Sequence, residues 1–282
     1  MPEVKLASWQ RAAIFNPWDH FAMWGGVGVG KSYSGTHFAI KQICEHPEQT
    51  GLIGANTYDQ LSQATLREFF YWLDHYGFEY VIDCRPPKAW AARRALKDYK
   101  NTISVRNPRT GKVTLIFTRV MSEPNALRGI EISWYWLDET RDMAEEMHDV
   151  VLSRIRETPN YAKGLITTTP NGEDWSYKRF FVNPANDDPS DMTYGSLHVA
   201  TIEAVKLGIL TQKYYDTMLK SYSPMMALQE LEAKHVNVFG AERKDDHPQV
   251  LLARSLCETP GGAFVPRAGG SVGTIVQQQW IQ

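Results

Sequence analysis

Short apolar runs alternate with longer amphipathic stretches along the first 200 residues. Four runs are apolar at nearly every position and predict strands buried on both faces, namely 20–26, 51–56, 132–138 and 164–169. Three stretches between them have the apolar spacing of helices, namely 31–45, 58–76 and 144–156. This alternation predicts an α/β fold, in which a mostly parallel central sheet carries helices on both faces. Two further segments, 101–107 and 112–120, predict a hairpin because Pro108 and Gly111 separate them.

The character of the chain changes after about residue 200, where short helices follow one another. We predict helices over 201–207, 211–222 and 224–234. The last one opens with Ser223 as its cap and Pro224 at its first helical position, which is a favoured combination at a helix start.

These patterns divide the chain into three parts. We predict a core over 1–200, a small helical lid subdomain over 201–240 and a short tail over 241–282. The tail has no helical period and is rich in glycine and proline, so we expect it to be loosely ordered.

Composition and charge narrow the class of protein. The 282 residues are 43% hydrophobic and 22% charged, which suits one large α/β domain with a small addition. The net charge of −2 means that any contact with nucleic acid must come from a local patch. Three cysteines form no paired framework, which favours a reducing compartment. We find no secretory signal and no apolar run of about 18 residues, so we expect no membrane span.

Residues 25–32 form a glycine-rich loop that fits the pattern G-x-x-x-x-G-K-[ST]. Glycines let backbone N–H groups turn toward phosphate oxygens at the positive end of the following helix. Lys31 would reach the β- and γ-phosphates, and the Ser32 hydroxyl would ligate Mg²⁺. The loop therefore predicts binding of ATP with Mg²⁺, through Gly25, Gly26, Val27, Gly28, Val29, Gly30, Lys31 and Ser32.

Two carboxylates, Asp138 and Glu139, end the apolar strand over 132–138. A magnesium nucleotide needs a carboxylate at a strand end near the loop serine, and Asp138 fits that role. Glu139 lies next to it and would polarise an attacking water. A second carboxylate at this position indicates hydrolysis rather than phosphoryl transfer to another substrate.

Several motifs then follow in a specific order. Asn125-Ala126-Leu127-Arg128-Gly129 precedes the acidic pair, and Thr167-Thr168-Thr169-Pro170-Asn171-Gly172 follows the next strand. Together with the phosphate loop, this string resembles the ATPase domain of large terminase subunits, the motors that package DNA into viral capsids. The resemblance covers about residues 5–240 and implies a P-loop NTPase of the additional-strand catalytic-glutamate type.

The resemblance also implies roles for individual residues. Gln10 resembles the glutamine that reads the adenine edge, and Arg128 resembles the arginine that reaches the γ-phosphate of a neighbouring subunit. Thr167, Thr168 and Thr169 resemble the coupling motif that senses the γ-phosphate. Glu139, Lys31 and Arg128 would thus form the catalytic set.

Partners follow from the same resemblance. Family members translocate double-stranded DNA into a procapsid as a ring, expected to be a pentamer, in the host cytoplasm. The ring works with the portal protein and a small terminase subunit.

The chain departs from the family pattern in two places. Many large terminases carry a basic residue inside the phosphate loop, whereas Gly26 to Val29 offers none. Positive charge beyond Lys31 must therefore come from elsewhere, and Arg128 of a neighbouring subunit is the candidate. Family members also continue into a nuclease domain, whereas 42 residues follow position 240 here. We therefore expect no nuclease activity from this chain.

A basic segment over 85–119 holds ten basic residues and a single acid, Asp98. Such a segment would track phosphates without reading bases, as a translocating motor should. We expect Arg93, Arg94 and Lys97 to contact DNA.

Other functions stay open at this point. A helicase-like NTPase that acts on nucleic acid would share most of these motifs. A nucleotide-binding assembly factor without turnover is a second alternative, although intact Lys31, Asp138 and Glu139 argue against it. A small-molecule kinase is disfavoured because no arginine-rich acceptor lid follows residue 200.

Overall fold

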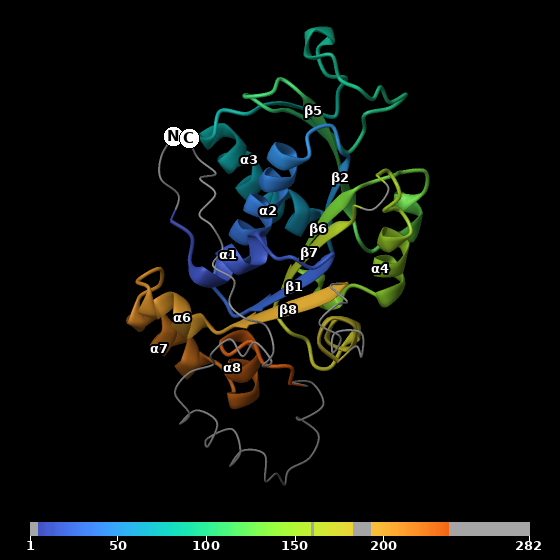
Figure 1. Cartoon of the computed structure of the whole chain (residues 1–282). Coiled ribbons are helices and arrows are strands. Elements are labelled where there is room, and N and C mark those ends of the chain that lie inside the picture. Colours follow the sequence, from blue (N-terminus) through green and yellow to red (C-terminus); the bar gives the residue numbers. More distant parts are fainter. Residues whose placement is uncertain (1–4, 159–160, 183–192, 237–282) are drawn as a thin grey trace.

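The computed structural model describes residues 5–158, 161–182 and 193–236. Within these ranges, eight strands form one sheet in the order β3-β4-β5-β2-β6-β7-β1-β8 (Figure 1). The strands are β1 (His20–Gly25), β2 (Gly51–Ala55), β3 (Glu79–Ile82), β4 (Thr102–Arg106), β5 (Val113–Val120), β6 (Trp134–Asp138), β7 (Lys163–Thr168) and β8 (Tyr194–Val199).

Helices and short helical turns connect these strands. The α-helices are α1 (Ser8–Ile14), α2 (Lys31–Glu45), α3 (Leu66–His75), α4 (Glu145–Leu152), α5 (Trp175–Tyr177), α6 (Thr201–Lys206), α7 (Gln212–Ser221) and α8 (Pro224–Glu230). Two π-helical turns are η1 (Gln60–Thr65) and η5 (Lys178–Val182). Three 3₁₀ turns are η2 (Lys88–Trp90), η3 (Pro124–Leu127) and η4 (Thr140–Asp142).

The centre of the sheet is parallel. Strands β5, β2, β6, β7, β1 and β8 pair in parallel, and only β3-β4 and β4-β5 are antiparallel among the described strands. Strand β7 lies between β1, which leads into the phosphate loop, and β6, which ends in the acidic pair. A strand inserted between these two is characteristic of NTPases of the additional-strand type, so the predicted fold class is confirmed.

Strand β6 shows why the sheet is buried on both faces. Trp134 and Trp136 belong to the hydrophobic cluster under α1, α2 and α3, whereas Tyr135 and Leu137 belong to the cluster under α4. Successive side chains of a strand point to opposite faces. A strand covered on both sides must therefore be apolar at successive positions, and β6 is so up to its last residue, Asp138. Figure 1 shows α2 and α3 on one face of the sheet and α4 on the other.

Most predicted elements match the structure, and the differences have local causes. The helix predicted over 31–45 and the hairpin over 101–120 are present as α2 and as β4-β5. The helix predicted over 58–76 begins as the π-helical turn η1, and the helix predicted over 144–156 ends at Leu152. Strands β3 and β8 were not predicted because edge strands carry exposed positions and so lack a fully apolar run.

Helices α6, α7 and α8 follow the edge strand β8. Ser223 caps α8 by accepting a hydrogen bond from the Met226 N–H at 3.3 Å, and Pro224 is at the first helical position, as predicted. The predicted tail over 241–282 and the last residues of the predicted lid lie outside the described residues. Among the described helices, none has the length and hydropathy that a bilayer crossing requires.

Candidate active site

The phosphate loop joins the end of β1 to the start of α2. Gly28 and Gly30 have φ angles of 78° and 82°, in the left-handed region that glycine adopts without strain. Gly30 directly precedes the first residue of α2, so the loop N–H groups gather at the positive end of a 15-residue helix. Both the glycine spacing and the helix start therefore suit a phosphate group.

Lys31 lies inside this loop with 9% of its surface exposed. Its Nζ donates to the Gly25 carbonyl at 3.0 Å, to the Gly26 carbonyl at 3.3 Å and to Thr169 Oγ1 at 3.1 Å. The ammonium group is thus held between the start of the loop and the end of β7.

Asp138 is buried at the end of β6 and accepts three hydroxyl hydrogen bonds. Thr167 Oγ1 donates to Oδ1 at 2.7 Å, and Ser32 Oγ donates to Oδ2 at 2.9 Å. Thr65 Oγ1 donates to the same Oδ2 at 2.9 Å. Burial raises the pKa of this carboxyl group, while the three hydroxyl donors and Lys31 oppose that shift.

The group of oxygens around Asp138 fits a magnesium ion. Ser32 Oγ and an Asp138 carboxylate oxygen meet at 2.9 Å, and both are hard oxygen donors. Magnesium in nucleotide sites needs only one or two such protein ligands, because phosphates and water supply the rest. In the described ranges, no group of three or more His, Cys, Asp and Glu side chains is arranged as a complete metal cage.

Glu139 has an unusual backbone, with φ 51° and ψ 53°. Its N–H donates to the Thr167 carbonyl at 2.7 Å, which holds this left-handed conformation against β7. A left-handed non-glycine residue costs about 1–3 kcal/mol and is concentrated at functional sites. Burial raises the pKa of the half-buried carboxyl group, Asp138 and Glu230 add to the rise, and Lys31 and Arg141 oppose it.

The three predicted coupling threonines do not all reach the site. Thr167 and Thr169 point to the same side of β7, where Thr167 contacts Asp138 and Thr169 Oγ1 donates to the Gly25 carbonyl at 3.3 Å. Thr168 Oγ1 donates instead to the main-chain oxygen of Thr169 at 3.2 Å. The run therefore presents two hydroxyl groups to the site and one away from it.

Gln10 lies on α1 against the phosphate loop. Its Oε1 accepts from the Ala7 N–H at 2.9 Å, and its Nε2 donates to the Val29 carbonyl at 3.5 Å. Trp9, which the sequence did not single out, donates from Nε1 to the same carbonyl at 3.0 Å. Helix α1 thus contacts the phosphate loop at the Val29 carbonyl through both side chains.

This geometry agrees with comparisons between the chain and known proteins. A family model described as the terminase large subunit, T4likevirus-type, N-terminal, matches residues 22–243. The chain belongs to this family. The resemblance read from the sequence motifs is therefore confirmed. No curated protein sequence matches the chain significantly.

Solved large terminases share the fold. The enzyme of a thermophilic bacteriophage in complex with ADP aligns with a TM-score of 0.65 at 14% identity, over 82% of this chain and 54% of that one. The ATPase domain of Thermus phage P74-26 aligns with a TM-score of 0.57 at 18% identity, over 82% and 94%. The large terminase of bacteriophage HK97 gives 0.54 at 11% identity, over 83% and 50%. The chain thus spans about half the length of the first and the last of these terminases.

Arg128 lies on the surface of this terminase chain. It follows η3 on the connection between β5 and β6, where its side chain is exposed. Its guanidinium group makes no hydrogen bond or ion pair with any residue that the structure describes. This placement leaves the side chain available to another molecule.

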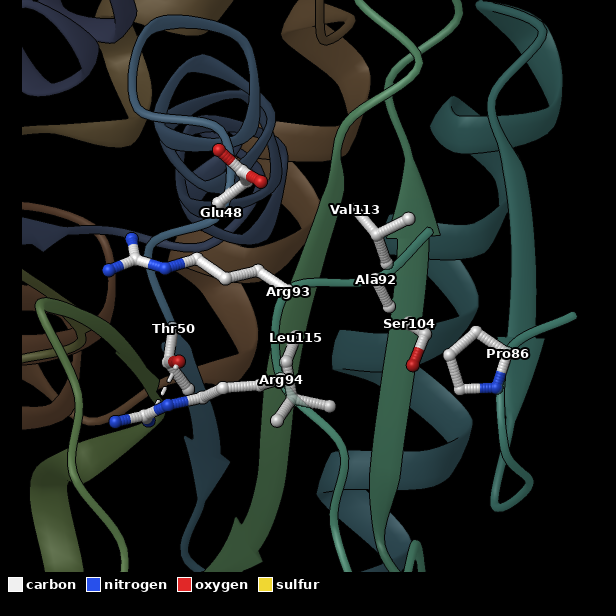
Figure 2. Close-up of a pocket in the computed structure, with 9 residues that line it drawn as sticks. All are labelled: Glu48, Thr50, Pro86, Ala92, Arg93, Arg94, Ser104, Val113 and Leu115. Atoms are coloured by element: carbon white, nitrogen blue, oxygen red, sulfur yellow. Dashed lines mark hydrogen bonds between the residues drawn. The ribbon is translucent and has the colours of Figure 1, made fainter. Parts of the chain in front are cut away.

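Two of the predicted DNA contacts, Arg93 and Arg94, lie near the N-terminal end of β2, whereas the phosphate loop follows the C-terminal end of β1. Arg94 Nη1 donates to Thr50 Oγ1 at 3.3 Å, and Thr50 directly precedes β2. Figure 2 shows Arg93 and Arg94 extending side by side toward this strand start and Glu48. Arg93 and Arg94 also line a neighbouring cavity of about 370 Å³.

Part of the basic segment is already paired within the chain. Arg94 forms ion pairs with Glu157 and Glu131, both at 3.3 Å. Arg119 donates to the main-chain oxygens of Asn101, Thr118 and Ala126. Arg93 and Lys97 are exposed and form no ion pair with a described residue. The charge available to a partner is therefore smaller than the sequence suggests.

Sequence reasoning missed two further parts of the site. Thr65 comes from the π-helical turn η1 and shares the Asp138 oxygen with Ser32. A buried hydroxyl on an otherwise apolar helix face was the available signal. The second part is a contact between the phosphate loop and the segment predicted as the lid. The Glu230 carbonyl accepts from the Val27 N–H at 2.8 Å, and Thr201 Oγ1 donates to the Val27 carbonyl at 2.8 Å.

Proposed function

We propose that this chain is an ATPase that drives double-stranded DNA into a viral procapsid. One observation carries the proposal. The Ser32 hydroxyl of the phosphate loop meets the Asp138 carboxylate of β6 at 2.9 Å, directly beside Glu139. A loop that cradles phosphate, a magnesium-binding pair and a second carboxylate are the parts that hydrolysis of a magnesium nucleotide requires.

ATP would bind with its phosphates in the loop between Gly25 and Ser32. The N–H groups at the start of α2 and the Lys31 ammonium group would neutralise phosphate charge. The Gln10 amide would donate to and accept from the adenine edge. The large terminase of the thermophilic bacteriophage has been solved with ADP and with ATP-gamma-S, which supports a nucleotide in this fold.

Mg²⁺ would be held by Ser32 and Asp138. The ion would supply neutralisation of the charge on the β- and γ-phosphate oxygens. Thr65 and Thr167 fix the orientation of the Asp138 carboxylate through their hydrogen bonds, so that the ligand is in place before the nucleotide arrives.

Glu139 would act as the general base for the attacking water. Burial raises the pKa of this carboxyl group toward neutral pH, and a general base is most effective when its pKa is close to the pH at which it works. Thr167 and Thr169 would report the state of the γ-phosphate, because they connect Asp138, Lys31 and the loop carbonyls.

The motor function would need other molecules. Exposed Arg128 would reach the γ-phosphate of a neighbouring subunit in a pentameric ring, where an arginine stabilises charge in the transition state. Double-stranded DNA would contact Arg93, Arg94 and Lys97. The portal protein and a small terminase subunit would complete the machine in the host cytoplasm, with helices α6 to α8 acting as the lid.

ATP turnover with and without double-stranded DNA tests this proposal. Wild type should hydrolyse ATP slowly alone, and Glu139→Gln should lose turnover while it retains nucleotide binding. Arg128→Ala should also lose turnover, and mixing Arg128→Ala with Glu139→Gln subunits should restore part of it, because mixed rings contain intact sites. Normal hydrolysis by Glu139→Gln would refute the catalytic assignment. ATP-dependent strand unwinding would instead favour a helicase-like function.

A further inference from the structure

Arg141 and Glu230 form an ion pair where the active site meets the lid. Arg141 Nη1 lies 3.0 Å from Glu230 Oε1, and the two side chains are 27% and 11% exposed. Gln229 Nε2 donates to the same Oε1 at 3.2 Å. Both side chains are largely shielded from water, so either partner left alone would be a partly buried charge without its counter-ion.

Arg141 is fixed to the hydrolytic side of this contact. It lies two residues after Glu139, in the 3₁₀ turn η4. Its main-chain oxygen accepts a hydrogen bond from Asn171 Nδ2 at 3.0 Å, which ties the turn to the segment after the coupling threonines. A shift of the Arg141 side chain would therefore be transmitted to η4, the turn that directly follows Glu139.

Glu230 is fixed to the phosphate-binding side. It is the last residue of α8, and its main-chain oxygen accepts from the Val27 N–H at 2.8 Å. A side chain at Gly26 would lie 3.0 Å from this same oxygen and 2.6 Å from the Leu231 oxygen, so the loop and the lid are in close contact. One lid residue thus touches both the phosphate loop and the segment after the catalytic carboxylate.

We propose that Arg141 is a positioning residue for Glu139, and that its ion pair with Glu230 couples the lid to the hydrolytic site. This inference rests on the proposed ATP hydrolysis. Movement of α8 would displace the Glu230 carbonyl from the phosphate loop and its carboxylate from Arg141 together. Lid position would then set both nucleotide contact and the placement of Glu139.

A double-mutant cycle in ATP hydrolysis tests the coupling. Glu230→Gln and Arg141→Gln should each lower kcat about tenfold or more, with the Kd for a fluorescent ATP analogue within about twofold of wild type. The double variant should be no slower than the slower single variant, and Arg141→Lys should retain most of the activity. Glu232→Gln is the matched control, since it removes a lid carboxylate that contacts Tyr215 rather than Arg141. It should leave kcat unchanged.

Hydrogen exchange in the nucleotide-free protein gives a readout that does not depend on turnover. The Met143 N–H donates to the Thr140 carbonyl at 2.9 Å within η4. Exchange of this segment should become several-fold faster in Glu230→Gln and stay at the wild-type rate in Glu232→Gln.

The outcomes separate the inference from the function on which it rests. Single-variant losses of kcat that multiply in the double variant would overturn the coupling. So would a rise in nucleotide Kd with kcat unchanged, or unchanged exchange in η4. If wild type and Glu139→Gln are equally inactive, the proposed hydrolysis fails, and the exchange experiment still decides whether the ion pair positions the turn.

Discussion

Thr65 donates its hydroxyl hydrogen bond to Asp138 Oδ2 at 2.9 Å across 73 positions of the chain. Ser32 of the phosphate loop donates to the same oxygen at the same distance. Oδ2 is therefore held by two elements, the start of α2 and the π-helical turn η1, while Thr167 of β7 donates to Oδ1. Such turns are rare and often accompany functional sites.

Replacing Thr65 by Val tests its contribution to magnesium binding. Val keeps the shape of the side chain and removes the hydroxyl, so Asp138 loses one of three donors. We expect the Mg²⁺ concentration for half-maximal ATPase activity to rise about 10- to 100-fold, as for other partners of a metal ligand. Thr65→Ser retains the hydroxyl and should stay close to wild type. An unchanged magnesium dependence of Thr65→Val would show that Ser32 and Thr167 orient the carboxylate alone.

Gly35 lies in the interior of α2, against the indole of Trp136. A Cβ atom at this position would lie 2.0 Å from two ring atoms of Trp136. The indole cannot easily retreat, because its Nε1 donates to Thr167 Oγ1 at 2.8 Å. Glycine normally weakens a helix by about 1 kcal/mol relative to alanine, so here close packing decides against the better helix former.

We expect Gly35→Ala to lower the free energy of unfolding by about 1–3 kcal/mol or more, in spite of its helix propensity. Urea denaturation measures this change. The double variant Gly35→Ala with Trp136→Phe should be more stable than the sum of the two single effects, because phenylalanine removes the clashing ring atoms. Full additivity, or a more stable Gly35→Ala variant, would show that the helix moves to make room.

A buried chain of hydrogen bonds holds two histidines neutral beneath the sheet. The Arg179 guanidinium group lies 2.7 Å from His148 Nδ1, which must accept because arginine only donates. His148 Nε2 then donates to the Tyr135 hydroxyl at 2.9 Å, and this hydroxyl donates to His20 Nδ1 at 3.1 Å. Burial, followed by the Lys163 and Arg179 charges, lowers the pKa of His20 to about 4, and burial also lowers the pKa of His148.

These shifts predict that acid destabilises the fold. The folded pKa of His20 lies below its unfolded value of 6.5, so the unfolded chain binds more protons between about pH 6.5 and pH 4. The free energy of unfolding should therefore decrease as the pH is lowered through this window. His20 alone should account for a decrease of about 2 kcal/mol between pH 7 and pH 5. Urea titrations at both pH values measure the loss. His20→Asn should flatten the dependence, whereas the exposed His75→Asn should leave it as in wild type. Equal unfolding free energies at the two pH values would contradict the neutral assignment.

Neutralising the basic residues that are expected to contact DNA should weaken DNA binding. The effect should be larger for a residue whose charge is not already paired with an acid of the chain. We expect Arg93→Gln and Lys97→Gln each to lower the affinity and to reduce the salt slope by about one. Arg94→Gln should have a smaller effect on binding, because Glu131 and Glu157 already pair with Arg94. Arg106→Gln, which breaks a pair with Glu79, serves as the control. Unchanged affinity of the first two variants at low and high salt would exclude these residues as DNA contacts.

Local sequence patterns predicted those elements whose structure depends mainly on residues within the element itself. Helix α2 runs from Lys31 to Glu45 as predicted, because its signals are local. Gly30 directly precedes its start, its apolar positions have helical spacing, and Pro47 follows its end. Strand β6 was predicted because its burial on both faces leaves no polar position before Asp138. The π-helical start of the next helix and the edge strands β3 and β8 depend on neighbours that no local pattern reveals.

The sequence by itself determined that the chain carries a phosphate loop, an acidic pair and a parallel α/β core, since each is encoded in a contiguous run of residues. Only the tertiary structure decided which distant side chains complete the site. Thr65 meets Asp138, and Arg141 meets Glu230, because folding brings separate elements to the same end of the sheet. It also decided that Arg94 is partly neutralised while Arg93 is not, because an ion pair depends on which acid lies nearby in space.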